Sequence, residues 1–113
     1  MQKTTSLLLV ALLGGLLFTS NAAADASRGK MVYMKKLKRI CKADGIKNGG
    51  IFAIKHSRRE WAALKEENKL KEEWNSICPH GAKKITKMRA KDVKNLYDFV
   101  WKYASDGEVP MCG

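Results

Sequence analysis

The sequence predicts an all-α fold, a small helical domain of about four helices. Apolar side chains recur at helical spacing in several segments of the chain. Glycine-containing breaks separate these segments, and none shows the alternation that is typical of a half-buried strand. The chain has 113 residues, and no internal repeat or low-complexity stretch follows its first 24 residues. This length predicts one small domain.

The first 24 residues have the pattern of a secretory signal peptide. Lys3 supplies a positive charge, an apolar run extends from Leu7 to Phe18, and three alanines at 22–24 offer a cleavage site. The apolar run is too short to span a bilayer. We therefore expect a signal peptide at 1–24, a helical domain at 25–113, a location in the periplasm and no membrane-spanning segment.

The first predicted helix covers residues 27–41, and glycines between 45 and 50 mark a loop after it. The short apolar run at 51–54 fits either a strand or a buried turn, because periodicity does not separate the two. Ser57 and Glu60 then match the capping box that starts a helix.

Two further apolar stripes follow the capping box. Pro79 ends the first, and Asn68 either separates two short helices or lies within one bent helix. The last helix is predicted over 91–105, where Asp106 and Gly107 end it. The stripes consist of Leu70, Trp74, Ile77 and Cys78, and of Val93, Leu96, Tyr97, Val100, Trp101 and Ala104.

The chain is strongly basic. Its formal net charge is +11, and removal of residues 1–24 takes away one lysine and no acidic residue. Such a charge favours acidic partners. Export argues against nucleic acid as a partner, and the basic residues form no arginine-rich arm. We therefore expect a basic face that docks on an acidic protein.

Three cysteines, at 41, 78 and 112, would be exported to an oxidising compartment. One disulfide leaves one thiol, and we expect a bond between Cys78 and Cys112 that would staple a small domain. A zinc or copper site of Cys41, Cys78, His80 and Cys112 is disfavoured because their spacing is not that of a zinc knuckle. The chain has no nucleophile motif, phosphate loop or zinc-protease motif, and we expect no enzymatic activity.

Both ends of the domain resemble small class I cytochromes c. Residues 29–33, Gly-Lys-Met-Val-Tyr, followed by a basic helix and Ala-Asp-Gly at 43–45, are similar to the opening of that family. Residues 96–103 are similar to its aromatic C-terminal helix, which crosses the N-terminal helix. The resemblance implies that Gly29 lets the two helix backbones approach, with Tyr33 packed beside them.

The haem-attachment motif of that family is missing. The two thioether cysteines would fall at Leu37 and Ile40, and the histidine at Cys41. Neither apolar side chain forms a thioether, so the resemblance implies a domain without covalent haem in the usual manner. If haem is bound, it implies Met88 as a distal ligand and Cys41 as the proximal ligand, or His56 after a shift in alignment.

The resemblance and the charge together predict an exported, haem-free accessory or docking module for an acidic redox protein. Two alternatives remain open. One is an electron carrier that holds haem noncovalently or through a single thioether at Cys41. The other is a thiol-based or metal-handling protein that uses Cys41 with Cys78 or Cys112.

Overall fold

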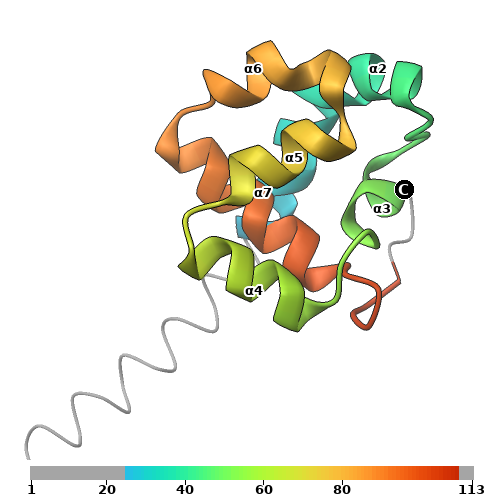
Figure 1. Ribbon diagram of the computed structural model, residues 1–113. Helices are drawn as coiled ribbons and strands as arrows, with labels where there is room; N and C mark the ends of the chain where they lie inside the picture. The colour runs from blue at the N-terminus through green and yellow to red at the C-terminus, as the bar shows by residue number, and fades with distance from the viewer. Residues whose placement is uncertain (1–24, 110–113) are drawn as a thin grey trace, which may run out of the picture.

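The computed structural model describes residues 25–109, and the expected signal peptide and Cys112 lie outside this range. The fold is all-α, as predicted: residues 25–109 contain helices and turns and no strand. They form six labelled α-helices rather than about four (Figure 1). The α-helices are α2 (Lys38–Cys41), α3 (Gly49–Ala53), α4 (Arg58–Glu66), α5 (Leu70–Ile77), α6 (Ala82–Thr86) and α7 (Ala90–Lys102); the shorter helices are η1 (Tyr33–Leu37), η2 (Lys42–Asp44) and η3 (Pro79–Gly81).

The predicted first helix is confirmed, although it is not regular throughout. Residues 25–32 are α-helical, η1 is a π-helical turn, and α2 completes the segment. The predicted stripe faces inward: Tyr33, Leu37 and Cys41 are fully buried. After α2, the 3-10 turn η2 ends at Gly45, whose φ of 81° favours glycine.

The middle of the chain differs from one prediction and decides another. The apolar run at 51–54 is neither a strand nor a buried turn: residues 51–53 belong to α3, where the Asn48 side chain accepts a hydrogen bond from the amide of Ile51, and Ile54 is the exposed C-cap. Asn68 separates two helices, since its φ of 61° is left-handed and stops α4 before α5 begins. The predicted capping box of Ser57 and Glu60 is present at the start of α4.

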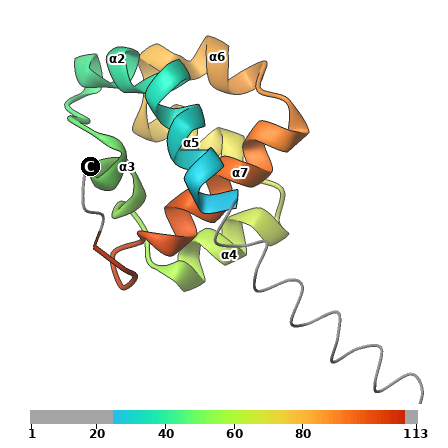
Figure 2. The same cartoon turned by 180° about the vertical axis from the view of Figure 1, so that it is seen from behind.

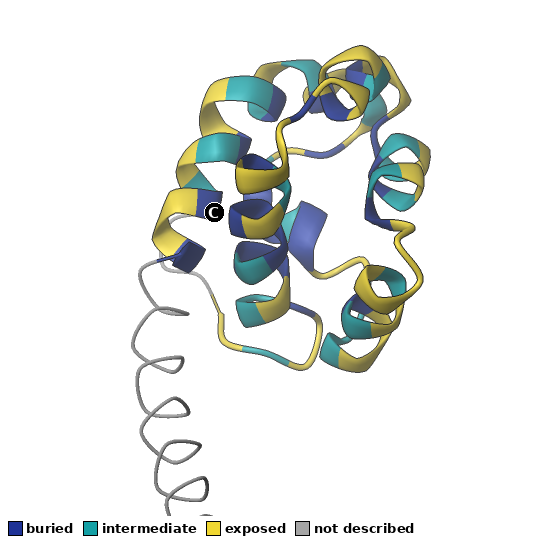
Figure 3. Ribbon diagram, turned by 90° about the vertical axis from the view of Figure 1, so that its left-hand side faces the viewer, coloured by how far each residue is buried: buried dark blue, intermediate teal, exposed yellow. Residues whose placement is uncertain are grey.

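Helix α7 is the centre of the fold. It packs against α3, α4 and α5, and the N-terminal helix crosses it on another side (Figure 2). Along all helices the buried residues face the interior and the exposed ones face outward (Figure 3). Fully buried aromatic side chains fill this interior: Tyr33, Phe52, Trp61, Trp74 and Phe99 are at most 1% exposed.

The crossing of the N-terminal helix over α7 depends on Gly29, as the resemblance implied. A Cβ atom on Gly29 would lie 1.9 Å from the main-chain oxygen of Asn95 and 2.7 Å from Cβ of Phe99. Only glycine therefore allows the two backbones to lie this close. The Lys36 ammonium reaches Asp92 of α7 at 3.0 Å and makes a second link between the same two elements.

Within residues 25–109, none of the helices has both the length and the apolar character needed to cross a membrane.

The variant Gly29→Ala is expected to lower the free energy of unfolding by about 3 kcal/mol, because the added methyl group forces the two helices apart. Urea unfolding followed by circular dichroism measures this. Ser27→Ala, on the exposed side of the same helix, is the control and should change stability by at most about 0.5 kcal/mol. Equal stability of Gly29→Ala and the parent would contradict the close crossing.

The Lys36–Asp92 pair predicts a loss of stability in acid. The hydrogen bond from Lys36 outweighs burial and holds the pKa of Asp92 below its usual 3.8. The folded protein thus favours the ionised carboxylate of Asp92. Its contribution to the free energy of unfolding is fully present above the pKa that Asp92 has in the unfolded chain, and it disappears as pH falls through the lower pKa of the folded protein. Asp92→Asn should cost about 1 kcal/mol at neutral pH. The difference from the parent should vanish in acid, and a difference independent of pH would contradict this assignment.

Candidate docking surface

The structure contains a disulfide bond between Cys41 and Cys78. The sulfur atoms are 2.07 Å apart, the Cα atoms are 5.3 Å apart, and both residues are fully buried. Cys41 is the last residue of α2, and Cys78 follows the end of α5. The predicted bond between Cys78 and Cys112 is therefore wrong, because Cys78 is already bonded to Cys41. Sequence spacing cannot show which buried faces meet, and that decides the pairing.

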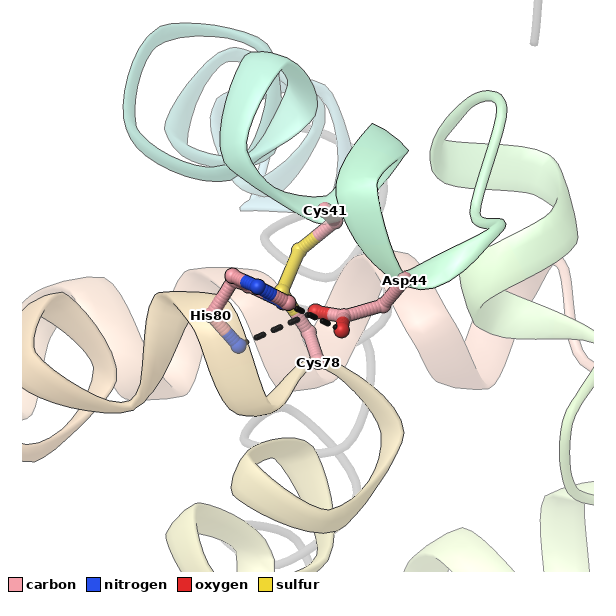
Figure 4. The surroundings of a disulfide bond; sticks show 4 residues. All are labelled: Cys41, Asp44, Cys78 and His80. Carbon is pink, nitrogen blue, oxygen red and sulfur yellow. Dashed lines mark hydrogen bonds and ion pairs between the residues drawn. A yellow bond between two sulfur atoms is a disulfide. The ribbon is translucent and has the colours of Figure 1, made fainter.

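Beside the disulfide, hydrogen bonds between His80 of η3 and Asp44 of η2 make a second link between the two segments that the disulfide joins (Figure 4). The main-chain amide of His80 donates to Asp44 Oδ2 at 3.0 Å, and His80 Nδ1 lies 2.6 Å from Asp44 Oδ1. Burial alone would raise the pKa of Asp44, but the two hydrogen bonds from His80 outweigh it and lower that pKa. Asp44 is thus an anion already bonded within the fold.

Gly81 allows η3 to lie against the disulfide. A Cβ atom at this position would be 2.9 Å from Cys78 Sγ and 3.4 Å from a methyl carbon of Leu37. The turn η3 therefore packs on both α2 and α5, which it contacts directly.

This packing brings together two segments of the chain that contain no acidic residue. Residues 26–43 carry seven lysines and arginines, and residues 74–91 carry five. The first segment ends in α2 and η2, the second contains η3 and α6, and α2 and α6 lie at the same end of the molecule in both views (Figures 1 and 2). We call this surface the basic end and define it by Lys38, Arg39, Lys42, Lys83, Lys84 and Lys87.

The charges of the basic end are not neutralised locally. Five of its six side chains belong to exposed residues, and Lys38 is partly exposed. Among the ion pairs of residues 25–109, none involves any of the six. Elsewhere in the domain basic side chains do form ion pairs with carboxylates: Lys94 contacts both Asp25 and Asp98. Burial raises the pKa of Asp98. The basic end therefore carries six cations without ion pairs, beside the one carboxylate of Asp44, which His80 binds.

Two of the three residues predicted as haem ligands, Cys41 and His56, have other side-chain partners in the structure. The Cys41 sulfur is bonded to Cys78 and offers no thiolate to iron. His56 Nε2 lies 2.6 Å from Glu73 Oε2, and its ring stacks edge-on against Trp61 with centroids 4.8 Å apart. Met88 is buried at 4% exposure.

Met88 is held against α5 through its main chain, since its carbonyl accepts from the Lys71 ammonium at 2.9 Å. His56 contacts Glu73 of the same helix. The contacts of these two residues and the disulfide of Cys41 are therefore made with partners other than iron.

The residues weighed as metal ligands are likewise accounted for by other contacts. Cys41 and Cys78 are bonded to each other, and His80 contacts Asp44. In the part of the chain that the structure describes, no three His, Cys, Asp or Glu side chains are close enough to hold a metal ion.

Comparison with models of known protein families, with curated proteins and with solved structures finds no match for this chain. The likeness to class I cytochromes c thus remains a hypothesis drawn from the residues of the two terminal helices.

Sequence reasoning missed the basic end. The prediction was a basic face formed by charges from every segment, whereas the structure gathers two particular segments. The absence of Asp and Glu from 26–43 and 74–91 was a visible signal. The two runs become neighbours through tertiary contacts alone: the Cys41–Cys78 bond, the His80–Asp44 hydrogen bonds and the packing of η3 on α2.

Removal of the disulfide tests its structural role. The double variant Cys41→Ala/Cys78→Ala should lose about 4 kcal/mol of unfolding free energy, because the bond closes a loop of 37 residues in the unfolded chain. Thiol titration of the denatured, unreduced protein should find one thiol in the parent and none in Cys112→Ser. If Cys78 were instead bonded to Cys112, the variant Cys112→Ser would show two thiols, those of Cys41 and Cys78.

Proposed function

We propose that this chain is an exported, haem-free docking module with a cytochrome c-like core, which binds an acidic redox protein of the periplasm. The single observation that carries the proposal is the basic end, where two acid-free segments meet. The secretory pattern of residues 1–24 supports the compartment. The close crossing at Gly29 supports the likeness of the core to cytochromes c.

The basic end suits an encounter surface for an acidic protein. Its lysine and arginine groups are exposed and lack carboxylate partners among the described residues, so their field extends into solvent. Such a surface accelerates association with an oppositely charged partner and fixes its orientation. Because exposed charges are screened by salt, we expect binding that weakens as ionic strength rises.

The two alternative functions have less support. An electron carrier with haem on Cys41 requires a free sulfur, and this sulfur is in the disulfide. A carrier with noncovalent haem remains the second candidate, and no cavity or side-chain arrangement of the described residues favours it over the docking module. A thiol-exchange protein needs an accessible sulfur for attack, and both Cys41 and Cys78 are fully buried. The docking module requires neither a cofactor nor an exposed thiol.

Charge reversal at the basic end tests the proposal. Isotope-labelled protein is titrated by NMR with acidic redox proteins purified from the periplasm of the source cell. The parent should show saturable shifts at α2, η3 and α6, and its affinity should fall about tenfold between low and physiological salt. Lys83→Glu/Lys84→Glu/Lys87→Glu should weaken binding by about tenfold or more at low salt.

The control makes the same change of net charge elsewhere. Lys55, Arg59 and Lys69 are exposed and lie after α3, in α4 and before α5, away from the basic end. Lys55→Glu/Arg59→Glu/Lys69→Glu should weaken binding by less than about threefold. Equal weakening by both triple variants would mean that net charge alone attracts the partner. The absence of saturable binding to every acidic redox protein tested would reject the function.

A further inference from the structure

A cleft opens between the end of α4, the start of α5 and the first half of α7, and none of the six residues that define the basic end lines it. Its volume is about 600 Å³, which lies within the usual range for small-molecule sites. The residues that line it are Lys65, Asn68, Leu70, Lys71, Ala90, Val93, Lys94 and Tyr97.

The polar lining of the cleft is cationic. Lys65, Lys71 and Lys94 contribute three ammonium groups, and none of the lining residues is a carboxylate. Carboxylates of Asp25 and Asp98 pair with Lys94. Lys71 instead donates to the main-chain carbonyls of Thr86 and Met88, at 3.0 and 2.9 Å, so its charge is held in place without being neutralised.

Lys65 adds a second cation that no carboxylate of the described chain pairs with. Its ammonium lies 4.8 Å from the centre of the Tyr97 ring. The Tyr97 ring therefore holds this cation at the wall of the cleft. The cleft thus presents ammonium donors to a bound anion.

Apart from the amide of Asn68, the rest of the lining is apolar. Leu70 is 7% exposed, and Ala90 and Val93 contribute methyl groups beside the ring of Tyr97. An apolar wall of this kind favours a ligand with its own apolar body, since burial of that body displaces water from both surfaces.

We infer that this cleft is a binding site for a small organic anion, a carboxylate or phosphate ester carried on a flat apolar body. Lys65 and Lys71 bind the anionic group, and Leu70, Val93 and the Tyr97 ring contact the body. The site does not depend on the docking function, because it uses none of the residues that define the basic end.

The test uses 2-naphthoate as the anionic probe and 2-naphthamide as its neutral analogue, titrated by NMR into the isotope-labelled protein. Naphthoate should give saturable shifts at Leu70, Ala90 and Val93 with a dissociation constant of about 1 mM or tighter. Naphthamide should bind at least about fivefold more weakly. Equal binding of the two probes, or no saturable shift with naphthoate, would overturn the proposal.

Variants separate the site from the general attraction of a basic protein. Lys65→Met/Lys71→Met should weaken naphthoate binding by about fivefold or more. Lys83→Met/Lys84→Met makes the same charge change in α6 and should alter it by less than about twofold. Because Lys71 also holds the chain at Thr86 and Met88, the single variant Lys65→Met is included, with an expected loss of about threefold. An equal loss in the α6 control would overturn the assignment of the site.

Discussion

The main-chain contact between Gly29 and Asn95 is the constraint on which the rest of this structure depends. It brings the N-terminal helix against α7, and this crossing positions Tyr33 and Phe99 so that Gly49 packs against both rings. Tyr33 in turn packs on Phe52, with ring centroids 5.0 Å apart, and Phe52 on Trp74 at 6.4 Å. The aromatic interior therefore follows from a close approach that a single hydrogen side chain permits.

Large aromatic side chains fill the interior of the domain. Trp61, Trp74 and Phe52 are fully buried, and Trp61 donates its indole hydrogen to the carbonyl of Ala53 at 2.9 Å. Close packing of such side chains provides the apolar burial that stabilises a small domain. Leu37 is buried in the same interior, and Ile40 packs against it.

The basic end carries an energetic cost that the structure offsets locally. Two segments rich in lysine repel each other when they are brought together, and salt screens this only in part. The Cys41–Cys78 bond and the contacts of His80 with Asp44 hold them in place. The positive charges of the basic end are thus held together despite their mutual repulsion. This local concentration of charge is the physical basis of the docking function proposed above.

The sequence by itself determined the all-α class and most of the longer helices, but not the short helices α3 and α6, and Trp101 of the predicted α7 stripe is 39% exposed. The capping box at Ser57, the stripe of α7 and the glycine at the helix crossing could all be recognised, because each depends on neighbouring residues or on one steric requirement. The tertiary structure alone decided that Cys41 pairs with Cys78 and that Lys65, Lys71 and Lys94 line one cleft. These relations join residues that are distant in the chain, and local periodicity contains no information about which buried faces meet.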